Sequence, residues 1–457
     1  MKAEVAGPAG GPGKKLPVPG QRSIAAFHLR EIVRAVQRVL LLFPTLWDAK
    51  QLEACRESLG AVDIVLGEPT DDACPWDFDL SGYLERLMRD VPAVSGVAST
   101  SDYPGAAMAA LTAQHLRLRG PSLRAVLTAG HKYLCRLSQS VSVPDAVPEF
   151  HLVDPGAPSA PPIAFPCFLK PVKGSFSIMT RRVETPEDLL RFVRRDAVQE
   201  FLAYYIHLFD RLLASCPEID LGAQYFLAEE LLTGTQVTVE GYASGSDVHI
   251  LGVVDSVLDS RTGSFVRFDY PSRLSPGILA RLGEITSRAV RHLGWSDGLF
   301  NVEMMVDPAE TRFSILEINP RLCGQFADLH LRVDGVSTYR TLIDLALGRP
   351  VAGSGSGAYG AASSFPLRVF EPARAERLPG PDHIREIEAR FPGSLIWVEG
   401  RDGDVLDDFE HEDGHSARYG VVNVAGEDHR EVLAKFKQIE AALGCRFTAL
   451  ESAVRSA

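Results

Sequence analysis

Two segments near the middle of the chain read as the paired strands of a hairpin whose glutamates face each other. Residues 301–306 (Asn-Val-Glu-Met-Met-Val) and 316–321 (Leu-Glu-Ile-Asn-Pro-Arg) alternate apolar with other residues and flank a turn-forming stretch. In a hairpin centred between them, Glu303 lies opposite Glu317, and Asn319, two residues on, shares their face. Directly opposed carboxylates repel and destabilise a bare sheet. The pattern therefore favours a cation between them, and the alternative is a surface hairpin whose glutamates face solvent.

A divalent cation would remove this repulsion. Mg²⁺ prefers hard oxygen ligands and keeps positions open for phosphate, so Glu303, Glu317 and Asn319 are candidate metal ligands. Arg321, just past the second strand, adds a planar fork of donors suited to phosphoryl or carboxylate oxygens.

Two lysines upstream of the hairpin stand in settings that suit phosphate. Lys132 is at a predicted helix start, where the alternative is an ordinary solvated lysine. Lys170 ends a short apolar strand, and a small-residue loop with Lys173 and Ser175 follows it. Backbone N–H groups of such a loop approach phosphates closely while a lysine supplies a point charge. The P-loop pattern G-x-x-x-x-G-K-[ST] is absent.

Taken in order, these segments resemble the ATP-grasp superfamily, and most of all its carboxylate–amine ligases, such as L-amino acid ligases and carnosine synthase. Glu303 and Glu317-Ile318-Asn319-Pro320-Arg321 resemble the metal-binding end of those enzymes. The resemblance implies that Lys132 and Lys170 reach the nucleotide phosphates and that the loop after Lys170 is a flexible flap.

Residues 226–240 resemble the adenine clamp between the two lobes of that superfamily. Glu229, Glu230 and Leu232 match the clamp. Gln236 stands where the family usually has an acid that binds the ribose hydroxyls, so a carboxylate restored there is expected to hold ATP at least as tightly.

The resemblance implies a reaction and its participants. We expect ATP and Mg²⁺ (or Mn²⁺) as cofactors, small-molecule carboxylate and amine substrates, an acyl phosphate, and ADP and phosphate as products; a homodimer is compatible with it. Phosphoryl transfer needs positioning and charge neutralisation rather than a nucleophilic side chain. Two alternatives stay open: biotin-carboxylase-like carboxylation, whose enzymes carry a longer glycine run after the second lysine, and a nucleotide-binding protein without catalysis.

The amine side of the reaction leaves a fainter pattern. Arg267 lies where related ligases often have a substrate loop, and it either clamps a substrate carboxylate as a catalytic residue beside Arg321 or pairs with Asp269. His330 is a general-base candidate, but a capping or core histidine is the more common environment.

Composition fits a soluble enzyme with several domains. The chain has 457 residues, 46% hydrophobic and 23% charged residues, and a formal net charge of −12. That charge opposes nonspecific nucleic-acid binding, which needs clustered basic residues. No apolar stretch reaches the ~20 residues of a membrane span. Seven cysteines without a C-x-x-C pair, and no secretory leader, predict a cytoplasmic protein.

The fold class expected is α/β and α+β: an ATP-grasp fold with an N-terminal open parallel α/β domain, split ATP-grasp lobes and a small α+β C-terminal domain. Strand-like runs at 39–43, 62–66 and 96–100 alternate with helices at 21–38, 51–59 and 80–90, which indicates a parallel sheet whose strand ends, including residues 101–105, face the ligand. One helix is expected over 184–213, with Pro186 at its first position. The expected divisions are a disordered tail (1–20), the N-terminal domain (21–125), the ATP-grasp domain (126–350) and the C-terminal domain (351–457).

Overall fold

The computed structural model describes residues 37–67, 78–90, 93–174, 178–353, 355–409 and 412–450. The predicted tail at 1–20, nearly all of the predicted helix at 21–38, and Ser175 lie outside the described residues.

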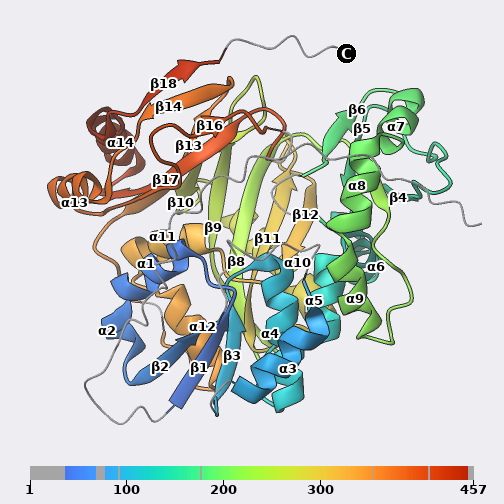
Figure 1. Cartoon of the computed structure of the whole chain (residues 1–457), viewed down its shortest axis with the longest axis horizontal. Helices are drawn as coiled ribbons and strands as arrows, with labels where there is room; N and C mark the ends of the chain where they lie inside the picture. The colour runs from blue at the N-terminus through green and yellow to red at the C-terminus, as the bar shows by residue number, and fades with distance from the viewer. Residues whose placement is uncertain are drawn as a thin grey trace, which may run out of the picture.

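The N-terminal segment forms a three-stranded parallel sheet in the order β2-β1-β3, which confirms the predicted strand–helix alternation (Figure 1). Hydrophobic side chains fill β1, where the last four residues are all buried. The chain leaves β3 through a short π-helical turn at Asp102–Ala106, at the carboxyl end of the strands. The elements are β1 (Gln37–Leu42), α1 (Leu46–Ala54), α2 (Arg56–Leu59), β2 (Val62–Leu66), α3 (Leu80–Asp90), β3 (Gly96–Ser99) and α4 (Ala107–Leu116).

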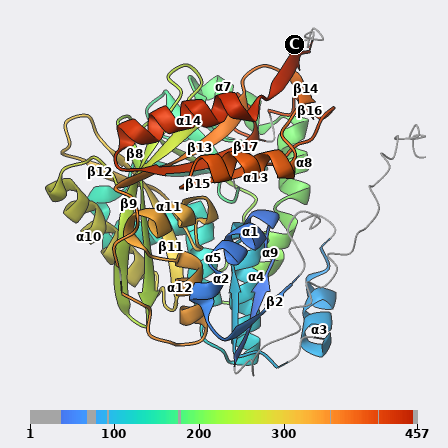
Figure 2. The ribbon, with the colours of Figure 1, turned by 90° about the vertical axis from the view of Figure 1, so that its left-hand side faces the viewer.

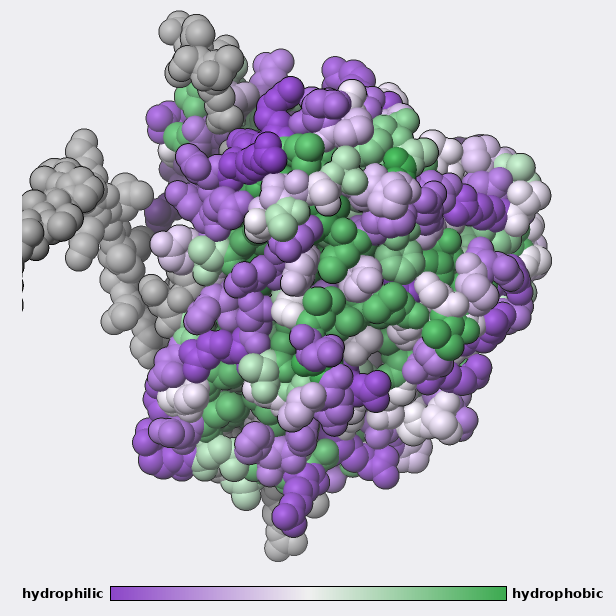
Figure 3. Space-filling view, turned by 90° about the vertical axis from the view of Figure 1, so that its right-hand side faces the viewer, coloured by the Kyte–Doolittle hydropathy of each residue, from purple (hydrophilic) through white to green (hydrophobic). Residues whose placement is uncertain are grey.

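A second, four-stranded sheet in the order β4-β7-β5-β6 forms a smaller lobe with its helices. Figure 3 looks onto this side of the molecule and shows apolar side chains in a band bordered by polar ones. The elements are α5 (Leu123–Gly130), α6 (Lys132–Ser142), a 3₁₀ turn (Pro144–Ala146), β4 (Phe150–Val153), β5 (Cys167–Pro171), β6 (Arg181–Val183), α7 (Pro186–Val193), α8 (Asp196–Tyr204), α9 (His207–Ala214) and β7 (Phe226–Glu230).

The single helix expected over 184–213 is wrong, because three helices, α7, α8 and α9, occupy this stretch. Its predicted start is confirmed: Thr185 caps α7 by accepting from the Asp188 backbone N–H, and Pro186 follows at the first position. Arg195 has an extended backbone conformation, which ends the first helix and lets the second begin at a new angle. Each short helix buries its own apolar face, so apolar spacing alone did not reveal the breaks.

An antiparallel sheet of eight strands, β12-β11-β8-β9-β10-β13-β17-β15, forms the centre of the molecule. Helix α10 packs against the face that carries Val237 and Val239, whereas α11 packs against the opposite face beside Val254 and Ala362. The elements are β8 (Thr235–Ser244), β9 (Asp247–Leu258), β10 (Phe265–Tyr270), α10 (Pro276–His292), β11 (Gly298–Val306), β12 (Phe313–Asn319), α11 (Gly324–Asp334) and α12 (Thr338–Ala346).

The C-terminal segment continues this sheet past residue 350 and adds a small sheet, β16-β14-β18. Helices α13 and α14 lie along the C-terminal strands (Figure 2). The elements are β13 (Ala361–Val369), β14 (Ala373–Arg377), α13 (Pro381–Arg390), β15 (Ser394–Val398), β16 (Val405–Leu406), β17 (Ala417–Gly426), α14 (His429–Leu443) and β18 (Arg446–Ala449).

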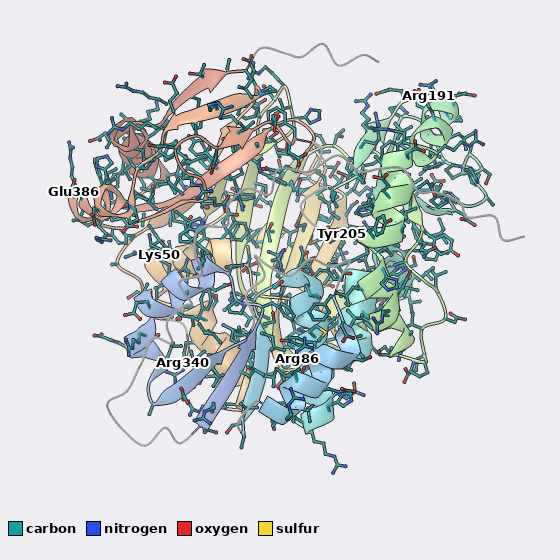
Figure 4. All side chains as sticks on the ribbon, viewed as in Figure 1. Lys50, Arg86, Arg191, Tyr205, Arg340 and Glu386 are labelled. Carbon is teal, nitrogen blue, oxygen red and sulfur yellow. The ribbon has the colours of Figure 1, made fainter. Side chains whose placement is uncertain are left out.

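Side chains of α1 fasten the N-terminal sheet to the rest of the molecule. The Trp47 indole donates to the Gly324 carbonyl at 2.9 Å, and Asp48 accepts from the Tyr339 hydroxyl. Lys50, labelled in Figure 4, reaches α13, where its Nζ donates to Glu388 at 2.7 Å. Among the described residues, no helix is both long and apolar enough to cross a membrane.

Candidate active site

The predicted hairpin forms in the predicted register. Glu303 of β11 pairs directly with Glu317 of β12, and Asn301 pairs with Asn319. The Asn319 amide donates to Glu303 Oε1 at 3.2 Å, so three oxygen-bearing side chains gather on one face of the sheet. Burial and the neighbouring charge of Glu317 raise the pKa of Glu303, an effect that Arg321 partly opposes.

A β-bulge follows this pair. Glu303 is opposite Glu317 but Met304 is opposite Ile315, so Leu316 is the extra residue on its strand. Ile315 therefore takes the buried place that alternation assigns to Leu316, and the Leu316 carbonyl turns toward two cations that are described below.

These ligands fit a magnesium ion by their chemistry. Within the described ranges no three His, Cys, Asp or Glu side chains are arranged to hold a metal. Mg²⁺, however, is commonly held by one or two carboxylates together with substrate phosphates. Two carboxylates and one amide oxygen meet that requirement, and a cation would relieve the repulsion that raises the pKa of Glu303.

Lys132 lies at the start of α6 and reaches the carboxylate pair. His131 caps the helix through Nδ1, which accepts from the Leu134 backbone N–H at 3.3 Å. The Lys132 Nζ lies 2.9 Å from Glu317 Oε1 and donates to the Gly174 carbonyl at 2.8 Å. One lysine thus joins the helix, the loop after β5 and the hairpin of candidate metal ligands.

Lys170 belongs to a buried group of three charges that the sequence only partly indicated. Its Nζ lies 2.5 Å from Glu229 Oε2, and Arg136 of α6 donates to Glu229 Oε1 at 2.5 Å. Both cations also donate to the bulged Leu316 carbonyl, at 3.2 Å and 2.8 Å. Arg136 was not predicted, although its place four residues after Lys132, on the same helix face, was a usable signal.

The pKa values of this group follow its burial. Burial lowers the pKa of Lys170, and Glu229 opposes that change. Burial also acts to raise the pKa of Glu229, but Arg136 and Lys170 outweigh it and hold that pKa below its ordinary value. Glu229 is therefore a charged partner for the two cations.

Lys173 turns toward the N-terminal segment. Its Nζ lies 3.3 Å from Asp102, and it also stands over the rings of Tyr103 and Phe209 at 5.1 and 5.3 Å from their centroids. Tyr205, which directly follows α8 and is labelled in Figure 4, packs its ring against that of Tyr103. The loop after β3 thus faces the lysines, as its place at a strand end predicts.

The clamp residues separate into different environments. Glu230 pairs with both terminal nitrogens of Arg312, at 2.5 and 2.7 Å, and Leu232 is half-buried just beyond β7. Gln236 is buried and its Nε2 donates to Glu303 Oε2 at 3.1 Å. The residue expected at the ribose therefore contacts a candidate metal ligand.

The two arginines named from the sequence lie apart. Following the strand pairing from Glu303 across β8 and β9 places Phe268 on the carboxylate face and Arg267 on the opposite face. There Arg267 donates to Asp269 at 2.8 Å, so the structure does not bring it to the other candidates.

Arg321, by contrast, adjoins the carboxylate face. In the described part of the chain no carboxylate lies within ion-pair distance of its guanidinium, and the only hydrogen bond that the guanidinium donates is a long one, 3.4 Å, to the Leu322 carbonyl. Burial acts to lower the pKa of Arg321, but neighbouring groups, among them Asp102 and Glu240, outweigh it and raise that pKa. The guanidinium is therefore charged and available to an anionic ligand.

Comparison with known proteins agrees with this geometry. Residues 163–328 match the family model of the ATP-grasp domain. Similar solved structures include an L-amino acid ligase from Bacillus licheniformis (15% identity, 91% of this chain and 99% of that chain, TM-score 0.68). A phosphoribosylglycinamide synthetase from Anaerococcus prevotii (13% identity, 91% and 100%, TM-score 0.62) and a biotin carboxylase from Campylobacter jejuni in complex with β-γ-ATP (14%, 91% and 93%, TM-score 0.61) are also similar.

Residues 163–328 therefore match an ATP-grasp domain, and the chain as a whole has the ATP-grasp fold, as the sequence motifs predicted. At these identities the structural neighbours show the fold and not the substrate.

Proposed function

We propose that this protein is an ATP-dependent ligase that joins a small-molecule carboxylate to an amine through an acyl phosphate, with ADP and phosphate as products. The observation that carries the proposal is the pairing of Glu303 with Glu317 beside Asn319, with Lys132 in contact with Glu317 and the charge of Arg321 acting on Glu303.

In this proposal the basic residues bind phosphate groups, and the residues with side-chain oxygens bind the metal ion. Lys132 and Lys170 bind the nucleotide phosphates, and the loop with Lys173 covers them. Glu303, Glu317 and Asn319 hold Mg²⁺ or Mn²⁺, which neutralises phosphate charge when bound. Arg321, which has no carboxylate partner among the described residues, stabilises charge that develops on the transferring phosphoryl group.

The amine then displaces phosphate from the activated carboxylate. Arg267 has no part in this scheme, because it lies on the opposite face of the sheet and is paired with Asp269. His330 is wholly buried rather than open to a substrate, so we assign it no proton-transfer role.

The decisive experiment incubates the purified protein with ATP, Mg²⁺ and pools of acids and amines. ADP and phosphate should form only when an acid and an amine are both present, together with a product of the summed mass less water. AMP as the product would refute the mechanism. Phosphate release that depends on bicarbonate alone would favour carboxylation, and no turnover with any acid would favour a binding protein.

Two further proposals concern the setting of the enzyme. Six cysteines in the described ranges are free thiols, which supports a reducing compartment and hence the cytoplasm.

We also propose that the protein can form a homodimer. Leu137 and Val141 of α6 are apolar and exposed, and a second copy could cover them. Light scattering would test this proposal by measuring the molar mass in solution.

A further inference from the structure

A line of buried polar side chains runs away from the candidate metal ligands across three neighbouring strands. Asn319 of β12, Asn301 of β11 and Glu240 of β8 pair in one row, directly beside the row that contains Glu317 and Glu303. All three are 5% exposed or less. Buried polar groups are costly unless they are hydrogen-bonded, so the bonds within this row indicate its role.

The hydrogen bonds fix which end of each amide faces which neighbour. The Asn319 amide nitrogen donates to Asn301 Oδ1 at 3.0 Å and to Glu303 Oε1 at 3.2 Å. Its two N–H groups are thereby used, and its oxygen is the atom left for a cation. Asn301 in turn donates from its own amide nitrogen to Glu240 Oε1.

Glu240, at the end of this row, determines which way the side-chain amides of Asn301 and Asn319 are turned. Its Oε1 accepts the hydrogen bond from the nitrogen end of Asn301 and so leaves the oxygen of Asn301 to accept from Asn319. His330 of α11 lies behind it, with Nε2 3.9 Å from Glu240 Oε2, and contributes positive charge when protonated. Burial raises the pKa of Glu240 to about 7, while His330, Asn301 and Arg321 act against that rise.

We propose that Glu240 and Asn301 are positioning residues that orient the Asn319 amide so that its oxygen faces the metal ion. The inference rests on the metal site of the proposed function and adds residues that do not touch the metal. Partners of this kind orient metal ligands, and their loss typically weakens metal binding about 10- to 100-fold. Reversal of the Asn301 amide would present nitrogen to nitrogen and turn the Asn319 oxygen away.

The test compares two substitutions of the same residue by direct metal binding. Glu240→Ala removes the acceptor, whereas Glu240→Gln keeps an oxygen that can accept from Asn301 and can turn its own amide nitrogen toward His330. Binding of Mn²⁺ in the presence of ADP is measured by the electron paramagnetic resonance signal of free Mn²⁺, which needs no turnover. We expect Glu240→Ala and Asn301→Ala to raise the Mn²⁺ dissociation constant about 10- to 100-fold. Glu240→Gln should keep a dissociation constant close to that of the wild-type protein.

Asp344→Asn is the matched control, because Asp344 is a buried carboxylate (1% exposed) that pairs with Arg340 on α12, outside the row. It should lower the melting temperature without changing Mn²⁺ binding. Unchanged Mn²⁺ binding in folded Glu240→Ala would overturn the inference, and so would a Glu240→Gln variant as weak as Glu240→Ala. If the wild-type protein itself failed to bind Mn²⁺ with ADP, the proposed metal site would fail first.

Discussion

The side-chain amide of Gln236 donates a hydrogen bond to Glu303 across 3.1 Å, and so restrains one carboxylate of the opposed pair. This contact joins the end of the predicted adenine clamp to the candidate metal site. A neutral donor suits this position, because burial and the charge of Glu317 already raise the pKa of Glu303.

Gln236→Glu should therefore weaken metal binding. The sequence alone favours an ATP affinity at least as high in this variant as in the wild-type protein. A carboxylate at position 236, however, would replace the hydrogen bond from Gln236 to Glu303 with repulsion from Glu303 and Glu317. We expect a higher Mg²⁺ concentration for half-maximal ATP turnover, measured by phosphate release at graded Mg²⁺. Gln438→Glu, on the exposed side of α14, is the control. Tighter MgATP binding at limiting Mg²⁺ would instead favour the ribose role.

Glu317→Ala should abolish ATP turnover, because it removes a proposed metal ligand and also the partner of Lys132 at 2.9 Å. Glu317→Gln keeps the shape and one oxygen, so we expect a folded protein with sharply weaker Mg²⁺ binding. Phosphate release and isothermal titration check the two expectations. Turnover near the wild-type rate in Glu317→Ala at ordinary Mg²⁺ concentration would show that Glu317 is not a metal ligand.

Substitution of Lys170 should change the affinity for ATP, whereas substitution of Arg321 should change the rate of turnover. Loss of Lys170 should weaken ATP binding outright, since we propose that its buried ammonium binds the nucleotide phosphates. Arg321→Ala should lower turnover about 10²- to 10³-fold, as loss of one preorganised electrostatic contact does, with little change in ATP binding. Steady-state kinetics combined with ATP titration separate the two, and equal losses of affinity in both variants would contradict the division.

Arg136→Ala should destabilise the fold, because among the described residues it leaves buried Glu229 with Lys170 as its one ionic partner. Breaking a buried ion pair from one side typically costs about 3 to 5 kcal/mol of the free energy of unfolding. Urea denaturation of Arg136→Ala, Glu229→Ala and the double variant gives the coupling between them. Additive losses would show that the two residues act independently.

His131 should make the protein sensitive to acid. Burial lowers its pKa to about 4, and its Nδ1 must be unprotonated to cap α6. In the unfolded chain His131 binds a proton near pH 6.5, whereas in the folded protein it stays neutral down to about pH 4. The free energy of unfolding should therefore fall as the pH drops from about 6.5 toward 4. His131→Asn keeps a capping oxygen without titrating and should flatten this slope. His249→Asn, at an exposed position, should leave the slope unchanged.

The sequence predicted those features that depend on local alternation. The register of Glu303 and Glu317 followed from the turn between two alternating strands, and the N-cap at Thr185 followed from the residues around Pro186. The bulge at Leu316 left no trace in the pattern, because alternation assigns that residue to the core. Arg267 could not be placed on a face without the pairing of four strands, and Gln236 could not be linked to Glu303 without the strand register.

The contact between Lys132 and Glu317 has a consequence for the order in which ligands arrive. The lysine ammonium lies 2.9 Å from a carboxylate oxygen that a metal ion would need. Free Mg²⁺ must displace that ammonium, whereas the phosphates of MgATP offer the lysine a new partner as the metal takes the old one. The enzyme would then bind metal and nucleotide as one complex, and free Mg²⁺ would be a poor competitor even at high concentration.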